Sequence, residues 1–160
     1  MDVRSVVLTE VLALLKEEED ALSGLLDLAI DEQSALIDSD FDRISSVSNQ
    51  MLESASKIDA IEARRLNLLR TVHAESMTLE ELLPLAEDLG INGFALARGQ
   101  MLARARELKE AQEQNARLLL NAMKLRDRWA NLLGGFAAPG YSNKGRRNTN
   151  ASRGTVSRSA

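Results

Sequence analysis

The sequence contains no cysteine, a single histidine and two prolines, and aromatic residues make up only 3% of its 160 residues. Without cysteine the chain can form neither a disulfide nor a thiolate metal site, which favours the reducing cytoplasm. The lone histidine, His73, lies at a predicted helix end and cannot supply a metal shell alone. Scarce prolines and aromatics, with abundant leucine, alanine, glutamate and arginine, predict an all-α fold.

Groups that support catalysis are also missing. There is no Glu-x-x-His pair, no glycine-rich loop that leads from a strand into a helix, and no histidine-bearing neighbourhood that would activate a serine. We expect the acidic run Glu17 to Asp20 to be a solvated helix face rather than a cation site. We therefore expect no enzymatic activity, no cofactor, no metal and no small-molecule substrate.

Long apolar runs are absent as well. The first residues, Met1 to Ser5, lead directly into an amphipathic pattern, and no stretch is long enough for a signal peptide or a membrane span. The sequence thus predicts a soluble protein without membrane insertion.

Charge is divided unevenly along the chain. Beyond Leu133 there are five basic residues and no acidic one, whereas the preceding part has 15 Lys and Arg against all 24 acidic residues. This split indicates two functional regions. An acidic body and one tyrosine without a stacking platform argue against nucleic-acid binding by the basic end.

Apolar residues recur every seven positions in three stretches, and this spacing predicts three long amphipathic helices over residues 4–38, 41–73 and 92–133. Ser39 is the expected cap of the second helix. Thr78 and Glu81 form a capping-box signature for a short helix over 79–89. Gly90 should terminate this helix, and Pro84 should kink or restart it. Asn92 is then the expected cap of the next helix. Five polar residues interrupt the stripes: Glu19, Gln33, Arg65, Asn115 and Arg126. Such residues usually set the register of the helices, but they equally suit a place where the seam opens to accept another chain.

Helices of such length are stable only when they pack against one another. We expect an elongated antiparallel bundle of three long helices over residues 1–133, with the short helix as the crossover. We interpret the glycine pair at 134–135 as the stop of the last helix, and residues 134–160 as a flexible, disordered basic tail.

The end of the last long helix carries more apolar residues than one packing stripe requires. Two interpretations are open: these residues form the core or a dimer seam, or they form a surface that receives the amphipathic helix of a partner. The candidate client-binding residues are Leu118, Leu119, Ala122, Met123, Leu125, Trp129, Leu132 and Leu133.

The tail has one aromatic residue, Tyr141, within a turn-prone basic stretch. Its composition is compatible with an inert solubilising tail. A single exposed tyrosine on a flexible chain is also typical of a short docking motif, and the basic charge would speed its encounter with an acidic partner.

Three segments resemble the FlgN-type flagellar export chaperones. The paired arginines of Arg64-Arg65-Leu66 are similar to a pair late in that family's second helix, and residues 108–119, with leucines around Asn115, resemble a pattern in its final helix. The segment Tyr141-Ser142-Asn143-Lys144-Gly145-Arg146 resembles the family's tyrosine-glycine-x-x-glycine element, with serine in place of the first glycine.

The resemblance implies a cytoplasmic chaperone of flagellar type III export that acts transiently at the export apparatus. Its clients would be the hook-filament junction proteins FlgK and FlgL, whose terminal helices it would keep unassembled, and its docking partner would be the export gate protein FlhA. The end of the last helix would bind the client, and Tyr141 and Gly145 would dock at the gate. The alternative is a structural, self-associating coiled-coil protein with an inert tail.

Overall fold

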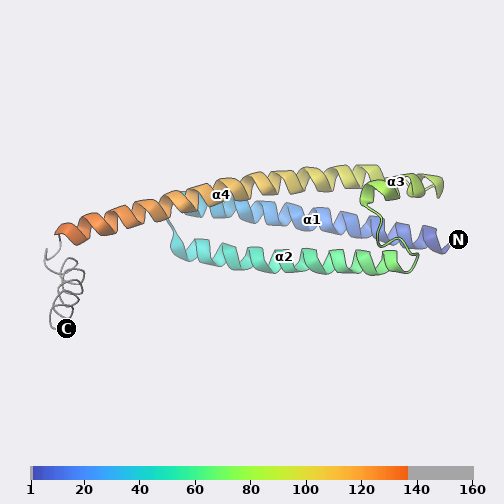
Figure 1. Cartoon of the computed structure of the whole chain (residues 1–160), viewed down its shortest axis with the longest axis horizontal. Coiled ribbons are helices and arrows are strands. Elements are labelled where there is room, and N and C mark those ends of the chain that lie inside the picture. The colour runs from blue at the N-terminus through green and yellow to red at the C-terminus, as the bar shows by residue number, and fades with distance from the viewer. Residues whose placement is uncertain (1, 137–160) are drawn as a thin grey trace, which may run out of the picture. The chain divides into compact units, whose positions relative to one another are not determined.

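The computed structural model describes residues 2–136 and contains four helices: α1 (Val3–Ile37), α2 (Phe41–Arg70), α3 (Leu79–Asp88) and α4 (Phe94–Phe136) (Figure 1). The described residues include no strand, and the predicted all-α fold is confirmed. The chain divides into two units, Met1–Leu118 and Leu119–Ala160, and α4 begins in the first and ends in the second.

In the first unit α1 lies between α2 and α4 (Figure 1). Helices α1 and α2 form an antiparallel hairpin, in which Glu17 pairs with Arg64 near one end and Asp31 with Arg43 near the other. Helix α4 runs parallel to α1, because its Arg104 contacts Glu19 and its Asn115, further along, contacts Ala29.

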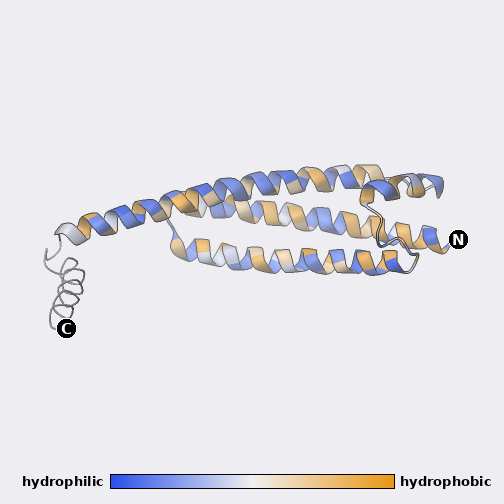
Figure 2. Ribbon diagram, in the orientation of Figure 1, coloured by the Kyte–Doolittle hydropathy of each residue, from blue (hydrophilic) through white to orange (hydrophobic). Residues whose placement is uncertain are grey.

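The main core of the first unit lies at the N-terminal half of α1, where α3 and the start of α4 close over it. Leu8 and Leu15 of α1 and Leu82 of α3 are fully buried, and Phe94 at the start of α4 is nearly so. A second cluster further along α1 joins Leu25 and Ala29 to Ile58 of α2 and Leu108 of α4. Figure 2 shows how apolar and polar residues alternate along the helices, as amphipathic packing requires.

The predicted caps of the short helix are confirmed, and the cap of α2 is corrected. Thr78 and Glu81 form a full capping box, and Gly90 follows the helix with a positive φ of 71°. Ser39, in contrast, is not the cap of α2; it occupies the left-handed region with φ 55°, and the next residue, Asp40, accepts the hydrogen bond from the Arg43 amide. Both residues have side chains suited to capping, so the sequence could not distinguish them.

Two further helix predictions differ from the structure. Helix α3 continues through Pro84, so of the two effects predicted for this proline the restart does not occur. Helix α4 begins at Phe94, after Gly93 and not directly after Asn92. Residues 134 and 135, predicted to stop the last helix, lie within α4. A glycine costs about 1 kcal/mol relative to alanine in a helix, which weakens a helix without necessarily ending it.

None of the helices within residues 2–136 is long and apolar enough to span a bilayer. The greater part of the predicted tail, residues 137–160, lies outside the described residues.

Candidate binding surface on helix α4

The face by which α4 packs in the first unit continues along the helix into the second unit. Met101, Leu108 and Asn115 are buried at seven-residue intervals in the first unit. The same spacing leads to Ala122, which is half-buried, and to Trp129, which is 53% exposed. Because residues seven apart lie on one face of a helix, the second unit presents the same kind of packing face with its side chains accessible.

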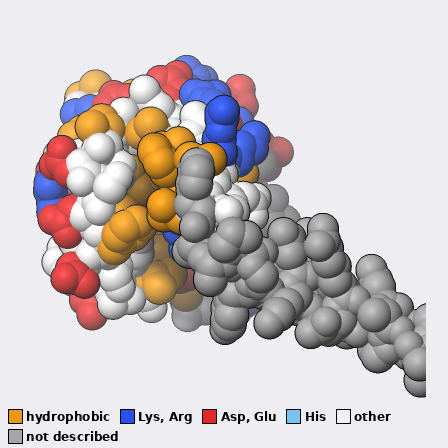
Figure 3. Space-filling model, turned by 90° about the vertical axis from the view of Figure 1, so that its left-hand side faces the viewer, with side chains coloured by type: hydrophobic (Ala, Val, Ile, Leu, Met, Phe, Trp, Pro, Cys, Tyr) orange, Lys and Arg blue, Asp and Glu red, His pale blue; other side chains and the backbone are white. Residues whose placement is uncertain are grey.

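The structure places the eight predicted client-binding residues on this part of α4. Leu118 and Ala122 are half-buried, and the other six are exposed, from 46% for Leu119 to 58% for Leu133. We define the apolar stripe as the five residues that share one face by helical spacing: Leu118, Ala122, Leu125, Trp129 and Leu132. Figure 3 draws one side of the structure, on which hydrophobic side chains lie at the surface beside charged and other polar ones.

Two basic residues flank the apolar stripe. With 3.6 residues per turn, Arg126 and Arg128 lie on its two sides, and Asp127 lies on the opposite face of the helix. All three side chains are exposed. The arrangement suits a partner helix that buries apolar side chains against the stripe and carries acidic groups at its margins.

The predicted docking residues, Tyr141 and Gly145, lie outside the described residues. Their role stays a prediction.

The acidic run of α1 is not a uniformly solvated face, and the prediction is wrong for Glu18. Glu18 is 4% exposed, and its side chain accepts a hydrogen bond of 2.6 Å from Arg65 of α2. Burial raises the pKa of Glu18 to about 7; the nearby Glu62 carboxyl adds to the increase, and the Arg65 guanidinium opposes it. One signal was available in the sequence, since Glu18 lies seven residues from the buried Val11 and from Leu25.

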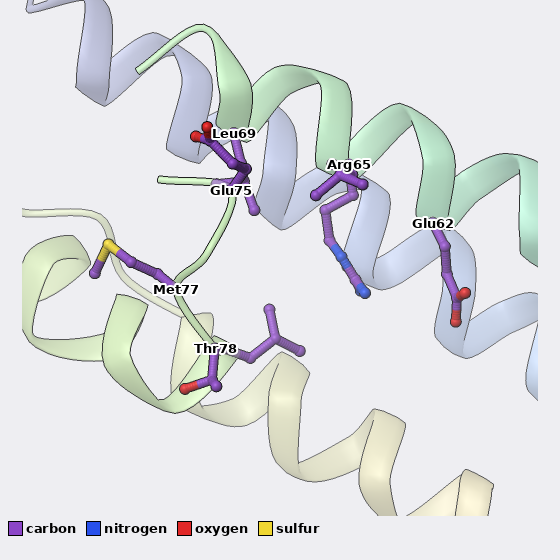
Figure 4. A pocket seen from close by; sticks show the side chains of 8 residues that line it. Glu62, Arg65, Leu69, Glu75, Met77 and Thr78 are labelled. Atoms are coloured by element: carbon purple, nitrogen blue, oxygen red, sulfur yellow. The ribbon is translucent and has the colours of Figure 1, made fainter. Parts of the chain in front are cut away.

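Arg65 borders a cavity of about 310 Å³ between α2 and the segment that leads into α3 (Figure 4). Glu62, Glu75 and Thr78 contribute further polar groups to the walls. Because the Arg65 guanidinium is already bound to Glu18, the described residues that line this cavity offer no free cation to a ligand. No group of three metal-ligating side chains occurs within residues 2–136.

A polar network joins the three long helices near the end of the first unit. Asn115 of α4 is buried. Its side-chain amide donates hydrogen bonds of 2.7 Å to the Ala29 carbonyl and of 3.1 Å to the Glu32 carboxylate, both on α1. Ser48 of α2 donates to the other carboxylate oxygen of Glu32 over 3.3 Å. The Asn115 Oδ1 atom has no hydrogen-bond partner among the described residues. The buried Asn115 amide nitrogen meets both acceptors only at one position of α4 along α1, which favours a single register of the two helices. This is one of the two roles predicted for Asn115.

A family model described as FlgN protein matches residues 1–149. No curated protein and no solved structure matches the chain significantly.

Proposed function

The chain belongs to the FlgN family of flagellar export chaperones, and from that premise we propose that its clients are the hook-filament junction proteins FlgK and FlgL. It holds their terminal helices in an unassembled state in the cytoplasm and carries them to the export gate protein FlhA. The activity is binding alone, without catalysis, cofactor or nucleic acid.

The observation that supports client binding is the exposed apolar stripe. Its residues continue the packing face of α4 on which Met101, Leu108 and Asn115 are buried, and Leu125, Trp129 and Leu132 remain about half exposed. Burying apolar surface contributes roughly 25 cal/mol per Å², so a client helix along this stripe gains a large part of its affinity from these side chains. Trp129 is the natural anchor, because tryptophan is enriched among the residues that dominate interface energies.

Docking at FlhA is assigned to the tail, around Tyr141 and Gly145. The family match extends to residue 149 and includes both. Because client and gate would contact different segments of one chain, the chaperone can engage both together, and the tether raises the effective concentration of the client at the gate.

The alternative is a structural coiled-coil protein whose stripe serves only self-association and whose tail is inert. Both hypotheses use the same exposed stripe. They differ in whether a client helix binds to it.

Fluorescence of Trp129, the only tryptophan, tests the proposal. Peptides of the terminal helices of FlgK and FlgL are titrated into the full chain, with scrambled peptides of equal composition as controls. We expect a saturable blue shift of the emission with the native peptides alone, because a bound helix removes the indole from water. A flat titration, with no heat of binding by calorimetry, contradicts the client site.

A further inference from the structure

A second apolar surface, the bundle groove, lies in the first unit between α1, α2 and the first part of α4. It measures about 350 Å³. Its apolar walls are Leu25 of α1 and Met51, Leu52 and Ala55 of α2, and Leu52 is 70% exposed. The polar residues that line it are Glu32, Ser48 and Gln112. A leucine this exposed beside a groove indicates a surface that can bury more apolar area.

The charged residue that lines this groove is Glu32, and its carboxylate has no cationic partner among the described residues. Glu32 accepts hydrogen bonds from Ser48 and Asn115, but no basic side chain within residues 2–136 forms a salt bridge with it. A half-buried carboxylate in an apolar wall favours an occupant that brings an arginine or lysine along with its apolar side chains.

The two units carry opposite charge. Met1–Leu118 contains 12 Lys and Arg against 23 Asp and Glu, whereas Leu119–Ala160 contains eight basic residues and one acidic residue. The only helix described in the second unit is the end of α4, which presents an apolar stripe flanked by Arg126 and Arg128. This segment therefore has both properties that the groove requires.

We propose that the bundle groove binds the end of α4 from a second copy of the chain. The apolar stripe of one copy covers Leu52 and Met51 of the other, and a flanking arginine reaches Glu32. A two-fold exchange, in which each stripe enters the other copy's groove, satisfies both surfaces and closes the assembly as a dimer. Insofar as the stripe also binds clients, which rests on the proposed function, client and second copy compete for it.

Sedimentation equilibrium of the full chain tests the dimer, with Leu52→Glu as the groove variant. Leu96→Glu is the matched control, because Leu96 is 66% exposed on α4 of the same unit and does not line the groove. We expect the wild type and Leu96→Glu to form dimers and Leu52→Glu to dissociate at least tenfold more readily, with equal helix content by circular dichroism. Raising the salt from about 50 to about 500 mM should weaken the dimer, because opposite charges attract across the interface. A wild type that stays monomeric up to about 100 µM, or equal dissociation of both variants, overturns the proposal.

Because the chain has no cysteine, cross-linking can identify the occupant of the groove. Leu52→Cys chains are mixed with Trp129→Cys chains under mild oxidation, with Leu96→Cys replacing Leu52→Cys as the control. We expect disulfide-linked pairs of the two different chains, and few with the control. If only the double variant, with Leu52→Cys and Trp129→Cys on one chain, forms a link, and does so within that chain, the groove holds the chain's own end and the proposal is wrong.

Client binding by Leu52→Glu separates this proposal from the proposed function. If clients and the second copy compete, the monomeric variant binds FlgK and FlgL peptides at least as tightly as the wild type. Self-association that Leu52→Glu abolishes, with no peptide binding by either form, leaves the dimer standing and contradicts the client role. If the wild type binds the peptides but never self-associates, the client role is supported and the dimer is contradicted.

Discussion

Arg65 of α2 donates a hydrogen bond of 2.6 Å to Glu18 of α1, and both side chains are largely buried where the two helices of the hairpin meet. The neighbouring residues Arg64 and Glu17 form a second ion pair, which is exposed to solvent. The two pairs thus have the same chemistry and differ in burial, so their contributions to the free energy of unfolding should differ.

Arg65→Met should destabilise the chain by about 3–5 kcal/mol at pH 8, because it leaves an ionised carboxylate buried without its cation. Arg64→Met should cost no more than about 1 kcal/mol, since exposed pairs contribute little. Chemical denaturation followed by circular dichroism measures both. Equal effects of the two substitutions would contradict a structural role for the buried pair.

The raised pKa of Glu18 predicts a distinct pH dependence. Between its ordinary value of 4.5 and about 7, the unfolded chain has released the Glu18 proton and the folded chain still holds it. The contribution of this group to the free energy of unfolding therefore falls as pH rises through that range, by up to about 3 kcal/mol, and is constant above it.

Glu18→Gln removes this contribution, since the amide resembles the protonated acid. Relative to the wild type, the variant should be of similar stability near pH 4.5 and more stable at pH 8. Glu17→Gln, at the exposed neighbouring position, is the control and should parallel the wild type throughout. A constant difference between Glu18→Gln and the wild type over the whole range would show that Glu18 does not titrate there.

The position of α1 in the bundle explains why the apolar stripes of the sequence did not predict the burial of Glu18. A helix packed against one neighbour buries one stripe, but α1 lies between two helices. Glu18 reaches Arg65 of α2, and the next residue, Glu19, reaches Arg104 of α4. The heptad spacing predicts one buried face; it does not say how many neighbours a helix has.

Local signals, in contrast, were sufficient for the short helix α3. The capping box at Thr78 and the glycine at Gly90 act through their own backbone neighbours, so the bounds of α3 follow from a few adjacent residues. The apolar excess at the end of α4 could also be recognised from composition. Its exposure could not, because exposure depends on whether another helix covers the stripe.

A charge placed in the apolar stripe should weaken client binding without unfolding the chain. Leu125 is 56% exposed, so Leu125→Asp has little effect on the core, but it places a carboxylate in the middle of the proposed interface. We expect at least a tenfold loss of affinity for the FlgK and FlgL peptides by calorimetry, which corresponds to about 1.4 kcal/mol. Leu96→Asp, on the same helix but outside the stripe, should retain wild-type affinity. If both variants bind equally well, the stripe is not the client site.

Removal of the tail should separate client binding from gate docking. A chain that ends at Leu133 keeps the whole apolar stripe and lacks Tyr141 and Gly145. In a pull-down it should retain FlgK and FlgL and lose FlhA. Loss of the clients as well would place part of their site beyond Leu133.

Within the full-length chain, Tyr141→Ala tests the anchor itself. A short docking motif depends on a few side chains, so the loss of one aromatic ring should weaken binding to FlhA about tenfold or more and reduce export of the clients. Ser142→Ala, at the next residue, is the matched control, because it leaves the ring and the basic charge of the tail unchanged. Client affinity and helix content should be the same in both variants, since neither residue belongs to α4, which ends at Phe136. If Tyr141→Ala lowers client affinity and helix content together with FlhA binding, the substitution damages the fold, and Tyr141 has no specific role at the gate.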